Sequence, residues 1–583
     1  MIVRQRDKHI EISFPFDMKL VAFVKSLEGR KYDARTKSWT IPMSRCGVSL
    51  HQLEKRGFVI DPDLMNAVEA DEKNASEAVA LASASDAEFT STLPLFPPQR
   101  VGAAFLFKAG SALLGDEMGV GKTIQSLAVA EAAGAEKVLI FCPKSVTEQW
   151  KDEIEKFLYG GNAPKGEIVV VKGTRRVRDI MLRDTITVKR ENWQGKVTTG
   201  HRKHGARFFI VNYELLLHNF DAMDCREWDM IIADEATKVS NAEAKISKAI
   251  KRLRAKRRIP MTGTPISNKP DEIWNLIDFV APGALGGYKA FLDRFCPRIT
   301  YRDSATGETK ALYKRQNQNM TELKALIQRY MIRRLLSEVH KDLPEKIVSD
   351  VPFELTDEEK ELYRKLQEEI LFAIAQEDIA KIENPMTIQY TLVKMLRLQQ
   401  LADSCELLGH NVRSSKMDVL KELLAQSLDG NDRKAIIFTK FATMADVLER
   451  ELAGYGALKI SGTIKEEYGD VVKKFNTDES KRVLIMTSAG QFGLNIQRAS
   501  VLFHFDSEWS LAKMRQRDGR AYRYGQKQTV LVYNLLAKGT VDYYIQKVVH
   551  EKSKLAGDLL GDNPGMNEGI TMSDIKGMLS QEL

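Results

Sequence analysis

Short apolar runs rich in Val, Ile, Leu and Phe alternate with helical patterns through most of the chain. Two series of such runs stand out, at 112–114, 138–141, 208–211, 230–233 and 259–261, and again at 435–438, 458–460, 483–486, 501–505 and 529–533. Apolar runs separated by helices are typical of β-α-β units and a parallel sheet. We therefore predict an α/β protein with two doubly wound lobes.

We place the two lobes at 93–300 and 411–560. A helical bridging region at 301–410 joins them, and within it Thr356 and Glu359 have the spacing of a capping box. That spacing predicts the start of an amphipathic helix, which we expect to run to about residue 383.

The two ends of the chain differ from the lobes in pattern. Residues 1–62 alternate short apolar runs with turn signals, which predicts a small separate α+β domain. Residues 63–92 are rich in Ala, Ser and Glu and contain one aromatic residue, Phe89, so we predict a linker that contributes little core. The Gly-containing tail at 561–583 is expected to be flexible.

The composition is typical of a globular protein of several domains, with 583 residues of which 43% are hydrophobic and 28% charged. No apolar run approaches the roughly 18 residues of a membrane span, and the first residues lack the apolar core of a signal peptide. The five cysteines lie too far apart for a zinc or redox motif. We expect an intracellular protein with no membrane partner.

Basic side chains are unevenly distributed along the chain. The net charge is only +8, from 87 basic and 79 acidic residues. However, Lys and Arg are concentrated in residues 1–60, in residues 172–207, where eleven basic residues stand against three acidic ones, and in residues 245–258, which contain no acid. Such clusters favour a phosphate backbone as partner, although a solvated helix face produces the same pattern.

A candidate phosphate-binding loop follows the run at 112–114. Gly119 and Gly121 allow backbone N–H groups to close on phosphate oxygens, Lys122 reaches the outer phosphates, and Thr123 offers a hydroxyl to Mg²⁺. The strict pattern requires glycine where this chain has Asp116, so an ordinary strand-turn-helix remains an alternative.

Two adjacent carboxylates follow the buried run at 230–233. Asp234 and Glu235 would be costly to leave unpaired at a sheet edge, and a metal ion accounts for them. We assign Asp234 to the Mg²⁺ shell, and Glu235 to orienting the attacking water and accepting its proton. Taken alone, the pair also fits a helix cap or a solvated turn.

A pair of arginines in the second lobe completes the candidate chemistry. Arg520 and Arg523 are three residues apart, so on a helix they would share one face. A guanidinium binds phosphate in bidentate fashion, which suits the charge on a transferring γ-phosphoryl group. A surface salt-bridge helix is the alternative.

Many separate motifs in order carry a family resemblance: GDEMGVGKT, FCPKSVTEQW, VNYELL, DEAT, MTGTPISN, MIRR, IIFTKF, TSAGQFGLN and QRDGRAYRYGQ. From about residue 93 to 554 the chain resembles the Swi/Snf-type ATPases of helicase superfamily 2. The resemblance implies two RecA-like lobes and makes Asp116 the expected residue. Asp234 to Thr237 departs from the family's DEAH or DEGH, so a contact made by the histidine is lost.

The resemblance implies a monomeric, ATP- and Mg²⁺-dependent translocase on double-stranded DNA. ATP binds between the lobes, with Gln99 reading the adenine and Asn495 facing the ribose, and Arg520 and Arg523 complete the site from lobe two. The residues assigned to DNA are Lys144 and Asn212 in lobe one and Lys440, Thr487 and Ser488 in lobe two.

Residues 1–62 resemble the HARP domain of annealing helicases, through FPFD and GRKYDARTKSWTIP. The pattern predicts a hairpin with strands at 30–32 and 38–42. Trp39 and Tyr32 suit base stacking, and the basic residues around them, Arg30 and Lys31 among them, suit phosphate contact at a DNA junction. The resemblance implies remodelling or reannealing of forked DNA. The plain alternative makes Trp39 a core residue.

Two other functions remain open at this stage. One is a superfamily 2 helicase that is stimulated by RNA or single strands. The other is a DNA-binding repair scaffold with an idle ATP site, against which the complete set of catalytic residues argues.

Overall fold

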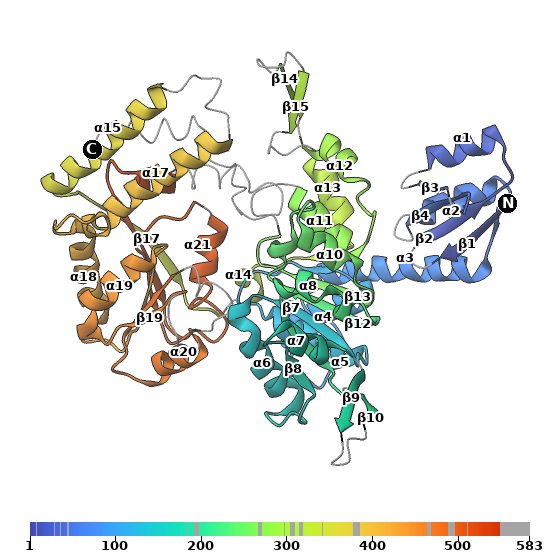
Figure 1. Cartoon of the computed structure of the whole chain (residues 1–583), viewed down its shortest axis with the longest axis horizontal. Helices are drawn as coiled ribbons and strands as arrows, with labels where there is room; N and C mark the ends of the chain where they lie inside the picture. The colour runs from blue at the N-terminus through green and yellow to red at the C-terminus, as the bar shows by residue number, and fades with distance from the viewer. Residues whose placement is uncertain are drawn as a thin grey trace. The chain divides into compact units, whose positions relative to one another are not determined.

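The computed structural model describes residues 1–547 except 7–8, 28–29, 35, 43–45, 184, 192–196, 204, 266–270, 297, 303–308, 314–318, 341, 377–384, 463–467, 488–495 and 510. The chain forms two compact units. Unit 1 consists of Met1–Ile266, Pro270–Ile299 and Leu312–Leu335, and unit 2 of Ser267–Lys269, Thr300–Ala311 and Leu336–Leu583. Figure 1 shows the helices and strands of both units.

A small five-stranded sheet opens unit 1, in the order β3-β4-β2-β1-β5. Its strands are β1 Ile2–Arg6, β2 His9–Ser13, β3 Lys31–Asp33, β4 Ser38–Pro42 and β5 Val59–Ile60, accompanied by helices α1 Met18–Ser26 and α2 Cys46–Lys55. β3 and β4 pair antiparallel with Tyr32 opposite Trp39, so the predicted hairpin is confirmed.

Helix α3, Pro62–Ala82, leads out of this small sheet. Asp61 caps its first turn, with a side-chain oxygen that accepts from the N–H of Asp63 over 3.0 Å, and Pro62 stands in the first turn, where a missing N–H costs nothing. Leu64 and Val68 are buried in the core of the small domain, which the Ala- and Ser-rich composition did not indicate. The other end of α3 packs along helix α4, Pro97–Ala109.

A seven-stranded parallel sheet forms the centre of unit 1, in the order β16-β6-β13-β12-β7-β11-β8. All five apolar runs predicted for this lobe are strands. The strands are β6 Leu113–Leu114, β7 Val138–Cys142, β8 Ile168–Val170, β11 Phe208–Asn212, β12 Trp228–Asp234, β13 Ala255–Met261 and β16 Met331–Ile332. β8 and β16 were not predicted.

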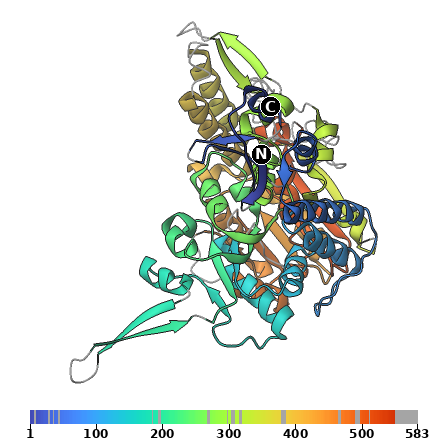
Figure 2. The same ribbon diagram turned by 90° about the vertical axis from the view of Figure 1, so that its right-hand side faces the viewer.

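Helices α4 and α5 Lys122–Ala132 pack against each other beside the sheet (Figure 1). The other helices of unit 1 are α6 Thr147–Tyr159, α7 Arg175–Leu182, α8 Leu215–His218, α9 Phe220–Met223, α10 Lys245–Arg252, α11 Asp271–Val280, α12 Tyr288–Phe295 and α13 Met320–Ile327. Two-stranded ribbons are formed by β9 Thr185–Glu191 with β10 Val197–Lys203, and by β14 Arg298–Arg302 with β15 Thr309–Tyr313. Figure 2 shows β9 and β10 extending away from the sheet of unit 1.

Unit 2 contains a six-stranded parallel sheet in the order β17-β22-β21-β18-β20-β19. The strands are β17 Lys346–Phe353, β18 Ala435–Phe438, β19 Leu458–Ile460, β20 Val483–Met486, β21 Val501–His504 and β22 Val530–Ala537. The five predicted runs are again strands, and β17 was not predicted. Two parallel sheets flanked by helices confirm the predicted fold class.

Helices α14 Leu336–Val339, α15 Asp357–Gln376, α17 Pro385–Asp403, α18 Ser415–Leu428, α19 Ala442–Glu451, α20 Tyr468–Thr477 and α21 Leu511–Asp518 complete unit 2. The predicted capping box is confirmed: the N–H of Thr356 donates to Glu359 over 2.9 Å and the N–H of Glu359 donates to the Thr356 hydroxyl over 3.3 Å.

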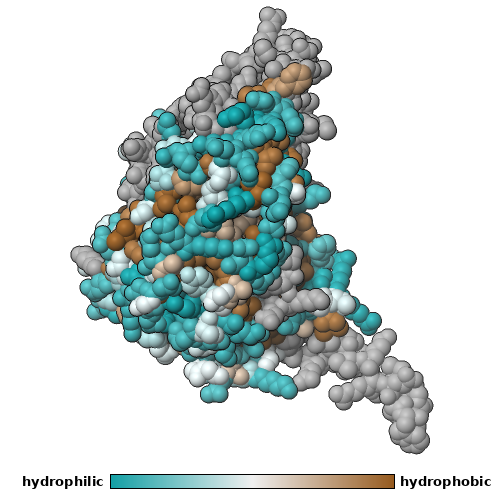
Figure 3. Space-filling model, turned by 90° about the vertical axis from the view of Figure 1, so that its left-hand side faces the viewer, coloured by the Kyte–Doolittle hydropathy of each residue, from teal (hydrophilic) through white to brown (hydrophobic). Residues whose placement is uncertain are grey.

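The face drawn in Figure 3 is mostly hydrophilic, with apolar side chains gathered in small groups. Exposed apolar residues of the helical region include Phe372 on α15 and Val393 and Leu396 on α17. Within the described ranges, no helix combines the length and apolar character that a bilayer span requires.

Candidate active site

The candidate phosphate loop lies between β6 and α5 and depends on two glycines. Gly119 has φ 87° and Gly121 has φ 94°, a left-handed backbone that other residues adopt only with strain. A Cβ on Gly121 would also lie 2.4 Å from Nε2 of Gln99. Both the backbone conformation and the packing therefore require glycine at position 121.

Gln99 holds the loop from α4. Its side chain is buried, its Nε2 donates to the carbonyl of Val120 over 3.0 Å, and its Oε1 accepts from the N–H of Phe96 over 3.1 Å. These bonds tie the start of α4 to the phosphate loop. Reading of adenine by the same amide stays a prediction.

Lys122 begins α5, directly after the left-handed glycine. Its ammonium donates to the carbonyl of Asp116 over 2.9 Å and to that of Glu117 over 3.3 Å. Both acceptors are neutral, so a phosphate oxygen, which forms stronger charge-assisted bonds, can replace them. The loop thus holds a cation in place for an anionic ligand.

Asp234 and Glu235 lie at the carboxyl end of β12. Oδ2 of Asp234 accepts from the indole N–H of Trp150 on α6 over 2.9 Å, and its Oδ1 accepts from the N–H of Glu235 over 3.0 Å. The Tyr213 hydroxyl donates to the carbonyl of Asp234 over 2.7 Å. Burial, together with the Asp234 charge, raises the pKa of Tyr213 well above its usual value, so the hydroxyl stays a neutral donor.

Glu235 has φ 50° and ψ 52°, a left-handed conformation that is uncommon for a side-chain-bearing residue. The turn changes the direction of the chain directly after Asp234, the last residue of β12, so Glu235 does not continue the alternation of the strand. Such positions are enriched at functional sites.

The donor set fits Mg²⁺. Thr123 follows β6 and Asp234 ends β12, and in a parallel sheet the carboxyl ends of both strands lie at one edge, with only β13 between them. A hydroxyl and a carboxylate supply the hard oxygen ligands that Mg²⁺ prefers. Among the described residues no group of three or more His, Cys, Asp or Glu side chains is placed to hold a metal.

Two predicted DNA contacts of unit 1 lie at the same edge. Lys144 follows β7 and its side chain is exposed. Asn212 ends β11 and uses its Oδ1 to accept from the N–H of Leu215 over 3.2 Å, so the side chain also shapes the turn into α8.

The helical placement of Arg520 and Arg523 is wrong. Helix α21 ends at Asp518, and both arginines lie in the turns that follow, because Gly519 interrupts the helix. Arg520 is buried, and its Nε donates to the carbonyl of Gln516 over 3.2 Å. Arg523 is half-buried.

Sequence reasoning missed Arg517, which is fully buried one turn earlier. Its Nη2 donates to Glu508 over 2.7 Å and lies 3.5 Å from Oδ1 of Asp506. Asp506 in turn accepts from the Thr439 hydroxyl over 2.7 Å. A buried ionic network therefore anchors the segment that carries the two arginines, and only a three-dimensional structure reveals that the acids meet it.

The predicted DNA contacts of unit 2 are held by protein groups. The ammonium of Lys440 donates to the carbonyl of Ser507 and to Oε1 of Gln399, the latter over 3.3 Å. Thr487 is buried beside β19, where its N–H donates to the carbonyl of Ile460 over 3.0 Å. Ser488 and Asn495 lie outside the described residues.

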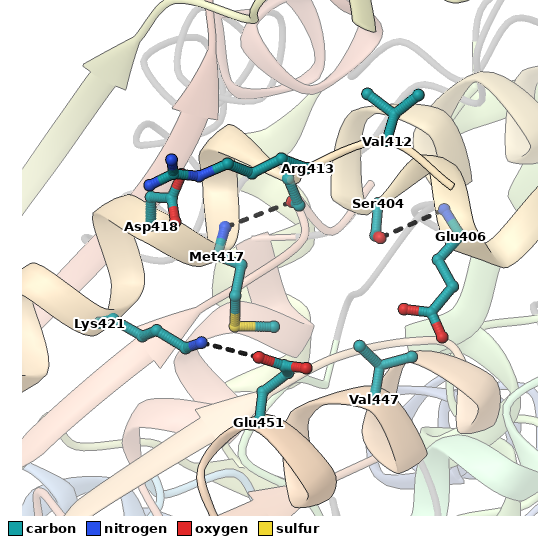
Figure 4. A pocket seen from close by; sticks show the side chains of 10 residues that line it. Ser404, Glu406, Val412, Arg413, Met417, Asp418, Lys421, Val447 and Glu451 are labelled. Carbon is teal, nitrogen blue, oxygen red and sulfur yellow. Dashed lines mark hydrogen bonds and ion pairs between the residues drawn. The ribbon is translucent and has the colours of Figure 1, made fainter. Parts of the chain in front are cut away.

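A cavity of about 280 Å³ lies between α18 and α19 in unit 2 (Figure 4). Its walls carry charged side chains that are paired with each other, including Lys421 with Glu451 over 2.7 Å and Arg413 with Asp418 over 2.7 Å. None of the predicted site residues lines it.

In the small domain, Tyr32 and Trp39 lie 5.1 Å apart between ring centres. Trp39 is half-buried against the core, whereas Tyr32 is 49% exposed. Lys31 is exposed, and Arg30 donates to the carbonyl of Leu27 over 3.1 Å. Of the two aromatic residues that the sequence suggests for stacking, the ring exposed beside these basic residues is thus that of Tyr32.

Comparison with known proteins finds two family models that match most of the chain. A family model described as SNF2-related domain matches residues 19–407, and one described as helicase conserved C-terminal domain matches residues 415–525. An uncharacterized ATP-dependent helicase of Mycoplasma pneumoniae is 28% identical over 473 residues, covering 79% of this chain and 41% of that protein. The putative ATP-dependent helicase/translocase YwqA of Bacillus subtilis is 28% identical over 478 residues, covering 78% of this chain and 47% of its own.

The solved SWI2/SNF2 ATPase core of Sulfolobus solfataricus in complex with dsDNA is 27% identical, covers 86% of this chain and 100% of that one, and has a TM-score of 0.37. The chain spans less than half the length of these two curated relatives. Neither family model is described as a HARP domain.

Proposed function

The chain belongs to the SNF2-related family and is a helicase-type ATPase, and from this premise we propose that it is an ATP-dependent translocase on double-stranded DNA that remodels or reanneals forks. One observation carries the proposal. The phosphate loop with Lys122, the Asp234–Glu235 pair and the exposed Lys144 all follow strands of one parallel sheet, at its carboxyl edge. Ligands of doubly wound sheets bind at that edge.

Each catalytic residue has a distinct role in ATP hydrolysis. Lys122 exchanges its two carbonyl acceptors for phosphate oxygens, while the N–H groups around Gly119 and Gly121 bind the phosphates. Glu235 orients the attacking water and accepts its proton. Arg520 and Arg523 stabilise the charge that develops on the γ-phosphoryl group.

Gln99 reads the adenine and Asn495 contacts the ribose. Thr123 and Asp234 hold Mg²⁺, which neutralises phosphate charge when bound. Trp150 keeps the carboxylate of Asp234 turned toward that position, because the indole N–H occupies one of its oxygens.

DNA is held through its backbone and not through its bases. Lys144, Asn212, Lys440, Thr487 and Ser488 are the contacts we assign, and such contacts carry little sequence information. In the small domain we assign Arg30, Lys31 and Trp39 to a duplex–single-strand junction, and we add the exposed ring of Tyr32.

ATP turnover with a panel of nucleic acids tests this function. We expect stimulation by forked and duplex DNA to exceed that by single strands or RNA by about tenfold. A Lys31→Glu/Tyr32→Ala variant should lose the preference for forks and keep its stimulation by duplex. Stimulation by RNA or single strands, with none by duplex or forked DNA, would instead identify a superfamily 2 helicase that acts on RNA or single strands.

The Lys122→Ala variant distinguishes an active ATPase from a DNA-binding scaffold with an idle ATP site. We expect turnover to fall by at least about a hundredfold, because the loop then lacks the cation that binds the outer phosphates. Turnover equal to that of the unsubstituted chain would mean that the site is idle and that the protein acts by binding alone.

A further inference from the structure

The segment that ends unit 1 is hydrogen-bonded along the start of the phosphate loop. The N–H groups of Leu113, Gly115 and Glu117 donate to the carbonyls of Tyr330, Ile332 and Arg334, over 2.8, 2.8 and 2.9 Å. The last residue of unit 1 is Leu335. The chain therefore leaves this unit directly beside the loop.

Arg334 extends this pairing with its side chain. The residue is 8% exposed. Its Nε donates to Oδ1 of Asp116 over 3.0 Å, and its Nη2 donates to Oδ2 of the same carboxylate and to Oε1 of Gln125, the latter over 2.9 Å. Its Nη1 donates to the carbonyl of Pro98. Asp116 is fully buried, so its charge depends on this bidentate partner.

Gln125 connects the ion pair to the far end of the loop. Its Nε2 donates to Oδ2 of Asp116 and to the carbonyl of Gly121, over 3.2 Å each. A Cβ on Gly102 would lie 1.8 Å from Oε1 of Gln125 and 2.5 Å from Nη2 of Arg334, so α4 leaves room for this network only because residue 102 is glycine.

Both ends of the phosphate loop are thus connected to one residue, Arg334, directly at residues 116 and 117 and through Gln125 at residue 121. The two carbonyls that receive the Lys122 ammonium belong to Asp116, held by the Arg334 guanidinium, and to Glu117, held by the Arg334 carbonyl. We propose that Arg334 is a positioning residue for nucleotide binding: through Asp116 and Gln125 it fixes the spacing between residues 116 and 121, and with it the place of the Lys122 ammonium.

The proposal explains the residue that departs from the strict loop pattern. A glycine at position 116 would leave the Arg334 guanidinium buried without its carboxylate, which is costly. A carboxylate at 116 without Arg334 would be equally costly. The two residues are therefore expected to act as one unit.

Nucleotide affinity of the full chain, without DNA, tests the proposal. We would titrate MgADP and MgATPγS into Arg334→Met, Arg334→Lys, Asp116→Asn and the Asp116→Asn/Arg334→Met double variant, with thermal melting in parallel. For Arg334→Met we expect both affinities to fall by about tenfold to a hundredfold. Arg334→Lys keeps the positive charge but cannot donate to both carboxylate oxygens in bidentate fashion, so its nucleotide affinity should lie between those of the unsubstituted chain and Arg334→Met.

Arg258 provides a matched control for the loss of a buried arginine. It is 5% exposed on β13 of the same unit and donates to the carbonyls of Phe279 and Leu253, over 3.1 and 2.8 Å. Arg258→Met should also lower the melting temperature, with unchanged nucleotide affinity. A purely structural role for Arg334 would leave the nucleotide affinity of Arg334→Met as unchanged as that of Arg258→Met, and that result would overturn the proposal.

The double variant tests whether the pair acts as one unit. We expect it to bind nucleotide no more weakly than the weaker single variant, because the second substitution removes nothing further. Additive losses would overturn the proposal. If Arg334→Met does not fold, Arg334→Lys and Asp116→Asn still decide: unchanged affinity in both refutes the positioning role. A failure of DNA stimulation in the unsubstituted chain would count against the proposed function and not against this role.

Discussion

The indole N–H of Trp150 donates to Oδ2 of Asp234 over 2.9 Å, so helix α6 fixes a carboxylate at the end of β12. Trp150→Phe keeps an aromatic ring but removes the indole N–H and its hydrogen bond to Asp234. The Asp234 carboxylate can then rotate away from the proposed Mg²⁺ position. We expect ATP turnover to fall by about tenfold and more Mg²⁺ to be needed for half-maximal rate.

Trp274→Phe is the control for that substitution. The Trp274 indole donates to the carbonyl of Gly286 over 3.0 Å, which lies outside the candidate site. The Mg²⁺ dependence of ATP turnover in Trp274→Phe should equal that of the unsubstituted chain. Equal Mg²⁺ curves for the two phenylalanine variants would exclude a role for Trp150 in orienting Asp234.

Glu235→Gln is expected to separate nucleotide binding from hydrolysis. Glutamine has the same shape and suits the left-handed backbone as well as glutamate does, but it cannot accept the proton of the attacking water. We predict that phosphate release slows by at least about a hundredfold while MgATPγS affinity changes less than about threefold. Exposed Glu214, which follows β11, is the control as Glu214→Gln. Retained turnover in Glu235→Gln would assign the proton to another group.

The sequence predicted the strands and the order of the motifs well, because buried parallel strands are apolar along their whole length. β8, β16 and β17 were missed. β17 is largely exposed and carries mixed residues. Length does not explain β8 and β16, which are as short as the predicted strands β19 and β6. The hydrogen-bond and ion-pair partners of side chains were even harder to predict from the sequence. Nothing local to Arg334 indicates that a carboxylate 218 positions earlier receives it.

The same limit applies to unit 2, where Lys416 is fully buried between two carboxylates. Its Nζ lies 2.8 Å from Oδ1 of Asp403 and 2.5 Å from Oδ2 of Asp542. Lys416→Met leaves both acids buried without a cation, so we predict a loss of about 3–5 kcal/mol in the free energy of unfolding. Lys421 lies on the same helix as Lys416, α18, and forms a partly exposed ion pair with Glu451 of α19. Lys421→Met breaks this pair and should cost less than about 1 kcal/mol. Urea denaturation of the full chain measures both, and equal losses would contradict the prediction.

Protonation of the Asp518 carboxylate should make unit 2 less stable in acid. Burial disfavours its charge, but the Lys346 ammonium at 3.1 Å and the His504 ring at 3.0 Å outweigh burial and lower the pKa from 3.8 to about 2. Because the folded pKa lies below the unfolded one, the stabilisation is complete above pH 4 and is lost as the pH falls toward 2.

We predict that Asp518→Asn costs about 2 kcal/mol at pH 7, and that the difference from the unsubstituted chain shrinks as the pH falls from 4 toward 2. Denaturant unfolding at pH 7, 4 and 3 measures it. A difference that is constant over this range would show that the charge of Asp518 does not stabilise the fold.

The rings of Tyr32 and Trp39 contact each other at a tilt of 53°, yet substitution of the two residues should have different effects. Trp39 packs on the core of the small domain, so Trp39→Ala should lower the stability of that domain by about 2–3 kcal/mol. Tyr32 is half-exposed, so Tyr32→Ala should leave stability within about 1 kcal/mol and weaken binding of a forked oligonucleotide by about fivefold, because one base loses its stacking partner. Fluorescence anisotropy with forked and blunt duplex DNA, beside thermal melting, separates the two effects. Unchanged fork binding in Tyr32→Ala would exclude the Tyr32 ring from the DNA contact and leave Trp39 as the stacking residue.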